Sequence, residues 1–124
     1  MKQARVLLAD DHVLFREGLA GIIGNQPDMQ VVGEANDGLE AFVKAQELKP
    51  DLILMDVQMP VMDGYEAARL LRERGFARPI IALTAHATRE HIGMAKGAGC
   101  DLFLSKPVTR SRLIETIAGL STFS

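Results

Sequence analysis

The residues with the clearest chemical potential each follow a short apolar segment of the chain. They are Asp10 and Asp11 after the first segment, Asp56 after the third, Thr84 after the fourth and Lys106 after the fifth. Carboxylates that converge on one place repel one another unless a positive charge compensates them. A hard divalent cation and a lysine ammonium group could supply that charge. These residue types therefore indicate a site for a cation and an anionic group.

The three aspartates would supply only oxygen ligands, since we expect no Cys or His to join them from a neighbouring strand. Oxygen ligands favour Mg²⁺ or Mn²⁺ over Zn²⁺, and Mg²⁺ retains room for phosphate oxygens. Lys106 and the Thr84 hydroxyl would stabilise the oxygens of a transferred phosphoryl group. A carboxylate would then be the nucleophile, and Asp56 is the best candidate because it follows the most central strand.

Each of these residues has an ordinary structural explanation when it is considered alone. A single aspartate after a strand usually forms a turn or caps a helix. We assign four further aspartates to such roles, namely Asp37, Asp51, Asp63 and Asp101. The combination of an Asp pair, an Asp, a Thr and a Lys at successive strand ends is much rarer than its members, so it favours a functional site.

Five apolar runs alternate with segments whose apolar residues recur at the helical period. The expected strands are 6–9, 31–35, 52–55, 80–83 and 102–104, and the expected helices are 14–23, 37–48, 63–71, 89–98 and 109–120. The first, third and fourth runs are apolar throughout, as in strands buried on both faces of a parallel sheet. Five such units predict a doubly wound α/β domain whose site lies beyond the carboxyl ends of its strands. The second strand has no residue at its end that could take part in this chemistry, which fits a position at the edge of the sheet.

Helix boundaries also carry local signals. Asp37 with Glu40, and Asp63 with Glu66, have the spacing of a capping box at a helix start. Gly99 is expected to end the fourth helix.

Composition limits the classes of function. The chain has 124 residues, which we expect to form one domain, 1–124, with no output domain. A formal net charge of -2 argues against direct binding to nucleic acid or an anionic membrane surface. The N-terminal apolar run is too short for a signal peptide or a membrane span, so we expect a soluble, cytoplasmic protein. The single cysteine, Cys100, fits a reducing compartment and is expected to be a buried apolar residue.

At these positions the sequence resembles the receiver domain of two-component response regulators. The resemblance covers residues 6–120 and rests on five motifs in order: LADDH at 8–12, DLILMDVQMP at 51–60, MDG at 62–64, IALTA at 81–85 and LSKP at 104–107. It implies a flavodoxin-like (βα)5 fold with a five-stranded parallel sheet of order 2-1-3-4-5. It also implies a phosphoprotein that acts as a signalling switch in two-component or phosphorelay signal transduction, and not as an enzyme.

The resemblance assigns the metal and phosphoryl chemistry to particular residues. Asp56 resembles the phosphoacceptor and also a ligand of Mg²⁺ or Mn²⁺. Asp11 resembles the direct metal ligand, Asp10 its water-mediated neighbour, and the backbone carbonyl of Gln58 the remaining protein ligand. Lys106 resembles the cationic partner of the phosphoryl group, and its peptide bond to the following proline is cis in the family.

The resemblance also implies a switch. Thr84 resembles the hydroxyl that turns inward to the phosphoryl group, and Phe103 resembles the aromatic switch residue, where many members have Tyr. Because Phe lacks the hydroxyl, switching would depend on burial of the ring. Phosphorylation would change the surface of the fourth helix, fifth strand and fifth helix. Gln58 and His86 occupy the positions that tune dephosphorylation.

The partners implied are a histidine kinase or a histidine phosphotransfer protein, and an output domain or effector protein. Homodimer formation on phosphorylation is compatible with this. The motif DDH followed by REGL at 16–19 resembles receivers attached to helix-turn-helix transcription factors. The motifs ALTAHA at 82–87 and GCDLFLSKP at 99–107 instead resemble receivers of hybrid sensor kinases and phosphorelays, so the output stays open.

Four other classes of protein share part of this pattern or of the expected fold. A haloacid-dehalogenase-type phosphohydrolase needs a second aspartate at position 58, where Gln58 stands. A flavodoxin-like FMN site would place phosphate against Asp10 and Asp11, which would repel it. A cobalamin module needs glycine where Phe15 stands. A receiver-like interaction domain that is not phosphorylated is the remaining alternative, but its usual mark, loss of the acidic pair, the acceptor or the lysine, is absent.

Overall fold

The computed structural model describes residues 3–120, so the ends of the expected domain, 1–2 and 121–124, lie outside the described residues. Five strands alternate with five helices along this part of the chain. They are β1 (Ala4–Ala9), α1 (Val13–Gly24), β2 (Met29–Ala35), α2 (Gly38–Leu48), β3 (Leu52–Asp56), α3 (Gly64–Glu73), β4 (Ile80–Thr84), α4 (Arg89–Ala98), β5 (Leu102–Ser105) and α5 (Arg110–Gly119).

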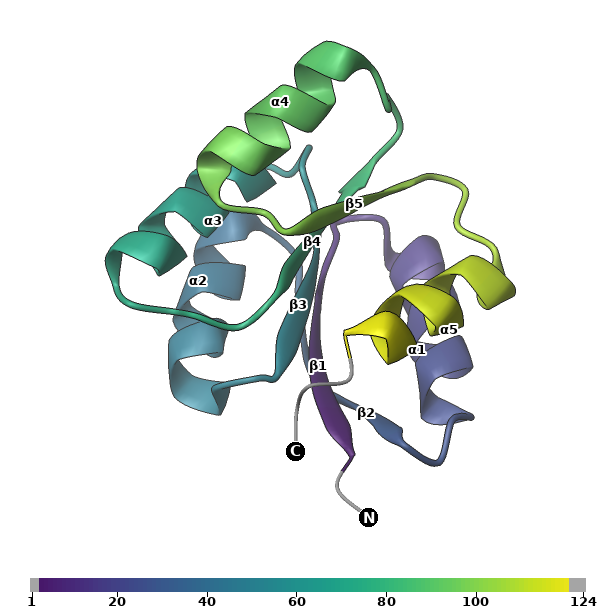
Figure 1. Cartoon of the computed structure of the whole chain (residues 1–124). Coiled ribbons are helices and arrows are strands. Elements are labelled where there is room, and N and C mark those ends of the chain that lie inside the picture. Colours follow the sequence, from purple (N-terminus) through teal and green to yellow (C-terminus); the bar gives the residue numbers. More distant parts are fainter. Residues whose placement is uncertain (1–2, 121–124) are drawn as a thin grey trace.

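The strands form one parallel sheet of order β2-β1-β3-β4-β5, which confirms the predicted doubly wound, flavodoxin-like fold. Helices α2, α3 and α4 lie on one face of the sheet, and α1 and α5 lie on the other (Figure 1). The order places β3 at the centre and β2 at an edge, as expected. The carboxyl end of β3 is therefore flanked by those of β1 and β4.

The apolar character of β3 follows from its two buried faces. Ile53 and Met55 pack in the core under α2, α3 and α4, whereas Leu52 and Leu54 pack in the core under α1 and α5. Successive side chains of a strand point to opposite faces, so both sets must be apolar. Each fully buried side chain of this size contributes about 1.5–3 kcal/mol. The strand that ends in Asp56 is thus held firmly on both sides.

Strands β1 and β2 each begin two residues earlier than expected, at Ala4 and at Met29. Edge strand β2 pairs with β1 through a bulge between Val6 and Leu7. Most of its residues are only partly buried, so its amino-terminal half lacked the continuous apolar run seen in the central strands. The end of β2 nevertheless lies where predicted, at Ala35.

Three predicted helix boundaries are confirmed at their caps, namely the starts of α2 and α3 and the end of α4. Asp37 accepts a hydrogen bond from the Glu40 amide, and Asp63 from the Glu66 amide, both at 2.8 Å. Gly99 follows α4 with φ of 103°, in the left-handed region that glycine tolerates best. The helices are 10 to 12 residues long, and none in the described part of the chain is long and apolar enough to cross a bilayer.

Two aspartates that were assigned to turns or caps have a different structural role. The Asp51 carboxylate accepts a hydrogen bond from the backbone amide of Arg5, at the start of the neighbouring strand β1. The Asp101 carboxylate accepts one from the amide of Ile80 in β4, and it also pairs with Arg72 at 2.8 Å. Both residues therefore link adjacent strands. This role depends on strand order, which a local turn signal does not contain.

Helix α3 begins in very close contact with the end of β3. A Cβ atom at Gly64 would lie 2.2 Å from the backbone oxygen of Asp56, so no larger residue fits without movement. The Gly64 amide also donates to the Val57 carbonyl at 3.1 Å. Glycine at this position lets the loop after β3 fold back tightly, which fixes the backbone that carries Asp56.

Candidate functional site

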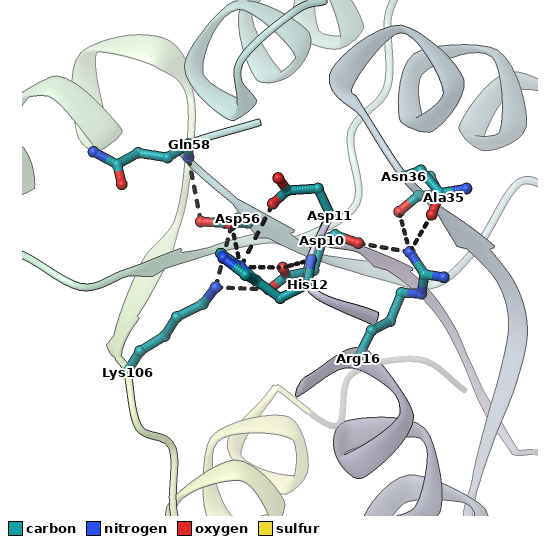
Figure 2. A network of polar contacts seen from close by, with 9 residues as sticks. All are labelled: Asp10, Asp11, His12, Arg16, Ala35, Asn36, Asp56, Gln58 and Lys106. Atoms are coloured by element: carbon teal, nitrogen blue, oxygen red, sulfur yellow. Dashed lines mark hydrogen bonds and ion pairs between the residues drawn. The ribbon is translucent and has the colours of Figure 1, made fainter. Parts of the chain in front are cut away.

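Four of the five residues predicted at the carboxyl edge of the sheet meet, whereas the Thr84 hydroxyl contacts His86 instead. Asp10 and Asp11 follow β1, Asp56 ends β3 and Lys106 follows β5 (Figure 2). Asp10 and Asp56 are buried, with 1% and 3% of their surface exposed, whereas Asp11 is exposed. Two buried carboxylates beside a more accessible third make a site that is open on one side.

Lys106 supplies the positive charge of this cluster. Its Nζ atom donates a hydrogen bond to Oδ2 of Asp56 at 3.2 Å and lies 2.8 Å from Oδ2 of Asp10. The same ammonium group lies 4.5 Å from the centre of the Phe15 ring, a cation–π arrangement. The Lys106–Pro107 peptide bond is cis, as the resemblance implied. Lysine thus contacts both buried carboxylates at once.

The buried carboxylate of Asp10 is incompletely satisfied. The contact of its Oδ2 atom with Lys106 lacks hydrogen-bond geometry, and no other donor in the described residues reaches this oxygen. A buried carboxylate oxygen normally has a hydrogen-bond donor or a metal ion as its partner. The donor set fits a hard divalent cation in this respect, with Asp10, Asp11 and Asp56 as the residues that would hold it.

A nitrogen donor joins the carboxylates, which corrects the expectation of an all-oxygen set. The Nδ1 atom of His12 lies 3.2 Å from Asp10 Oδ1, 3.5 Å from Asp11 Oδ1 and 3.9 Å from Asp56 Oδ2. One donor atom from each of these four residues lies within 4.8 Å of the others. The prediction considered only residues from neighbouring strands, whereas His12 follows Asp11 directly and turns back over the site.

The environment of Asp56 raises its pKa above the ordinary value of 3.8. Burial is the largest cause because it penalises the charged form, and the negative charge of Asp10 adds to it. The backbone amide of Gln58, 3.2 Å from Oδ1, and the ammonium group of Lys106 oppose the shift. Asp56 is thus a buried carboxylate whose negative charge is only partly compensated by its neighbours.

Sequence reasoning did not identify the role of Arg16. This buried side chain donates to the backbone oxygen of Asp10 at 2.6 Å, to Asn36 Oδ1 at 2.7 Å and to Glu34 Oε1 at 2.8 Å, and a longer bond of 3.3 Å reaches the Ala35 carbonyl. Arg16 therefore joins the ends of β1 and β2 beside the site (Figure 2). The sequence signal for this role is that Arg16 comes four residues, about one helical turn, after His12.

The side chains expected to act in switching and in dephosphorylation make no hydrogen bond to Asp56 within the described residues, and Gln58 contacts it only through its backbone amide. The Thr84 hydroxyl donates to the backbone oxygen of His86 at 3.2 Å and accepts from the His86 amide at 3.0 Å. His86 itself is exposed, with its ring centre 5.5 Å from that of His91. Phe103 is half-buried and packs against the core under α4. The side chain of Gln58 points away from Asp56 (Figure 2).

Cys100 is buried, as predicted, and burial raises the pKa of its thiol to about 11. The thiol therefore stays protonated at neutral pH and packs as an apolar group.

Comparison with known proteins identifies the family. The family model described as the response regulator receiver domain matches residues 6–118. Transcriptional regulatory protein PdtaR of Mycobacterium tuberculosis is 42% identical over 113 residues, which cover 91% of this chain and 54% of that protein. The uncharacterized transcriptional regulatory protein YhcZ of Bacillus subtilis is 39% identical over 112 residues, covering 90% of this chain and 52% of that protein. The chain thus spans about half the length of these curated relatives.

Solved structures agree with this result. The signal receiver domain of the response regulator NarL from Mycobacterium tuberculosis superposes with a TM-score of 0.92 at 32% identity, covering 96% of each chain. The chemotaxis protein CheY4 of Vibrio cholerae gives a TM-score of 0.88 at 32% identity, covering 95% of this chain and 98% of that one. The chain therefore belongs to the response regulator receiver domains, the signalling domains of two-component systems.

Proposed function

We propose that this receiver domain is a phosphoacceptor switch that takes a phosphoryl group onto Asp56 in a reaction that depends on a divalent cation. The observation that carries the proposal is the environment of the Asp56 carboxylate. It is buried beside Asp10, one of its oxygens accepts from Lys106 and the other from the Gln58 amide. A carboxylate held in this way is oriented for attack, and a cation held beside it would stabilise charge on the phosphoryl oxygens.

The chemical step is an in-line transfer. A carboxylate oxygen of Asp56 forms a bond to phosphorus while the bond from phosphorus to the leaving group breaks. With a phosphohistidine donor, the imidazole nitrogen leaves with the bonding electron pair and the donor is left as histidine. Lys106, which already contacts both buried carboxylates, is placed to neutralise the charge that the arriving phosphoryl oxygens bring.

The cation is Mg²⁺ or Mn²⁺ in this proposal, held by Asp10, Asp11 and Asp56 together with the backbone carbonyl of Gln58. When bound, it would neutralise charge on the carboxylates and on the phosphoryl oxygens. The buried oxygen of Asp10 that lacks a hydrogen-bond donor supports a cation at this place.

The switch is proposed to begin at Thr84. A phosphoryl group on Asp56 offers the Thr84 hydroxyl a stronger acceptor than the His86 carbonyl that it contacts now. Movement of Thr84 inward would leave space for the Phe103 ring, which is only half-buried in this structure. The surface formed by α4, β5 and α5 would change as a result.

The lifetime of the phosphoryl group is proposed to depend on Gln58 and His86. Both side chains are exposed and polar, so each could hold a water molecule near phosphorus or obstruct its approach. Replacement of either by alanine should change the rate of dephosphorylation but leave phosphorylation intact. Phosphate decay that is identical in wild type, both single variants and the double variant would contradict this role.

The proposed partners are a histidine kinase or histidine phosphotransfer protein as donor, and an output domain or effector protein as target. We propose that residues 1–124 act as one receiver unit, without direct contact to nucleic acid or membrane, in the cytoplasm. Relatives named as transcriptional regulators support an output domain elsewhere in a longer chain. Homodimer formation on phosphorylation is part of the same proposal.

Beryllofluoride, a mimic of the phosphoryl group, tests the proposal without a kinase. Backbone NMR spectra of the protein should change on addition of beryllofluoride with Mg²⁺, around Asp56, Thr84 and Phe103. The Asp56→Asn variant should show no such change, whereas Asp28→Asn, on an exposed turn, should behave like wild type. Spectral changes that persist in Asp56→Asn would contradict the assignment of the acceptor.

A further inference from the structure

The side chain of His12 adds a nitrogen atom to the proposed cation site, in hydrogen-bond contact with Asp10 Oδ1. Its ring is 67% exposed, yet its Nδ1 atom faces Asp10, Asp11 and Asp56. The His12 backbone amide also donates to Asp10 Oδ1 at 2.8 Å, which holds the residue against the carboxylate pair. Although an exposed histidine ring could turn into solvent, the His12 ring lies against the carboxylates.

The spacing of these atoms matches the requirement of a single bound ion. In an octahedral site with bonds of about 2.1 Å, adjacent donor atoms are about 3.0 Å apart and opposite ones about 4.2 Å apart. In a tetrahedral site with bonds of about 2.1 Å, donor atoms are about 3.4 Å apart. The observed separations from His12 Nδ1 are 3.2, 3.5 and 3.9 Å. His12 can therefore share an ion with the carboxylates with little movement.

A second observation indicates a ligand at the same place. The Asp10 carboxylate is 1% exposed, and its Oδ2 atom lies 2.8 Å from Lys106 Nζ but accepts no hydrogen bond of good geometry from the described residues. The cluster is therefore more than a group of exposed acidic side chains. It combines a buried, unsatisfied carboxylate oxygen with an imidazole nitrogen.

We infer that His12 is a metal ligand and that it makes this site prefer a first-row transition-metal ion, such as Co²⁺ or Zn²⁺, over Mg²⁺. Imidazole nitrogen suits these ions, whereas Mg²⁺ prefers oxygen ligands alone. The inference rests on the cation site of the proposed function and adds to it the class of ion. Mg²⁺ would still bind through the carboxylates, but with no contribution from His12.

Titration calorimetry with MgCl₂, CoCl₂ and ZnCl₂ at one neutral pH tests this inference on the whole chain. The His12→Ala variant should bind Co²⁺ and Zn²⁺ about tenfold more weakly or worse, because loss of even an outer-shell partner costs about 10–100-fold. Its affinity for Mg²⁺ should stay within the error of the titration. Since His12 is the N-cap of α1, His12→Asn provides a variant with a good capping residue and an oxygen in place of the nitrogen. The His12→Asn variant should show the same weaker binding of Co²⁺ and Zn²⁺ relative to Mg²⁺.

His91 provides the matched control, because its ring and that of His86 are close enough to attract a transition-metal ion on their own. The His91→Gln variant should keep the affinities of wild type for all three ions. Nitrogen-15 NMR of the imidazole rings with Zn²⁺ should show the shift of a coordinated Nδ1 for His12 and not for His91.

The outcomes separate this inference from the proposed function. If His12→Ala weakens the binding of all three ions equally, the effect is a general electrostatic one and the inference is overturned. Unchanged Zn²⁺ binding in both His12 variants, or its loss in His91→Gln, would overturn it as well. Asp11→Asn reports on the cation site itself: if that variant binds Mg²⁺ and Zn²⁺ like wild type, the proposed cation site is wrong, not only the role of His12.

Discussion

Lys106 and Asp56 are in direct contact at 3.2 Å although 50 positions separate them in the sequence. Lys106 follows β5 and Asp56 ends β3, and strand β4 lies between these two strands. The contact therefore requires three neighbouring strands to end at the same level. It connects the proposed acceptor to the part of the surface that is expected to change on phosphorylation.

Replacement of Lys106 by methionine tests how much the buried carboxylates depend on it. Without a cation, the loss of this contact should lower the free energy of unfolding by about 1–3 kcal/mol, because buried acceptors are left unsatisfied. Mg²⁺ should restore part of that loss, since it supplies positive charge to the same carboxylates. Urea unfolding with EDTA and with Mg²⁺ measures both effects. The control is Lys96→Met, on the exposed side of α4, which should be nearly neutral; equal stability of the two variants would contradict the prediction.

The raised pKa of Asp56 predicts a stability that depends on pH. Because the pKa is higher in the folded state than the ordinary value of 3.8, folding favours the protonated acid. The ionised group therefore costs stability above the folded-state pKa, and this cost disappears below pH 3.8. In EDTA, Asp56→Asn should be more stable than wild type at pH 7, and its advantage should shrink as the pH falls. If the stability advantage of Asp56→Asn is constant with pH, or if the variant is less stable at pH 7, burial and Asp10 do not dominate the pKa of Asp56.

Two helical glycines, Gly64 and Gly93, allow a test of the close contact between α3 and the backbone of Asp56. Gly64→Ala should destabilise the protein by about 1–3 kcal/mol, because its Cβ would overlap the backbone oxygen of Asp56. Gly93→Ala, in α4, meets no atom within 4 Å and should stabilise by about 0.5–1 kcal/mol through helix propensity. Thermal unfolding of both variants measures the difference. Similar effects of the two substitutions would show that α3 can move away from β3 at no cost.

Thr84→Ala separates phosphorylation from switching. The variant should accept a phosphoryl group, because Asp56 and Lys106 are unchanged, but it lacks the hydroxyl that would turn towards the phosphoryl oxygen. NMR signals of Phe103 should therefore shift on phosphorylation in wild type and much less in Thr84→Ala. Thr84→Ser retains the hydroxyl and should behave like wild type. Identical Phe103 shifts in all three proteins would show that Thr84 does not transmit the signal.

The carboxyl-edge residues could be predicted because a parallel sheet brings strand ends together regardless of their distance in sequence. Asp10, Asp56 and Lys106 needed only the identification of strands, and the apolar runs of β1 and β3 were unambiguous since both faces are buried. The caps at Asp37 and Asp63 were predicted from the capping-box spacing. The doubly wound fold was predicted from the alternation of strands and helices, and its strand order from the family resemblance.

The residues that were missed reach the site from a helix rather than from a strand end. His12 and Arg16 lie at and just after the start of α1, where their direction depends on how that helix leaves β1. Asp51 and Asp101 were assigned to turns or caps because their hydrogen bonds run to amides of neighbouring strands, which no local pattern specifies. Tertiary arrangement, not residue type, decides these four roles.

Intact-mass spectrometry after incubation with acetyl phosphate tests the central claim most directly. With Mg²⁺, wild type should gain the mass of one phosphoryl group, and the adduct should be stable in acid and lost in base, as expected of an acyl phosphate. EDTA should abolish the adduct, and Asp56→Asn should show none, whereas Asp28→Asn should be labelled like wild type. Undiminished labelling of Asp56→Asn, or labelling that is independent of a divalent cation, would contradict the account of Asp56 as the cation-dependent phosphoacceptor.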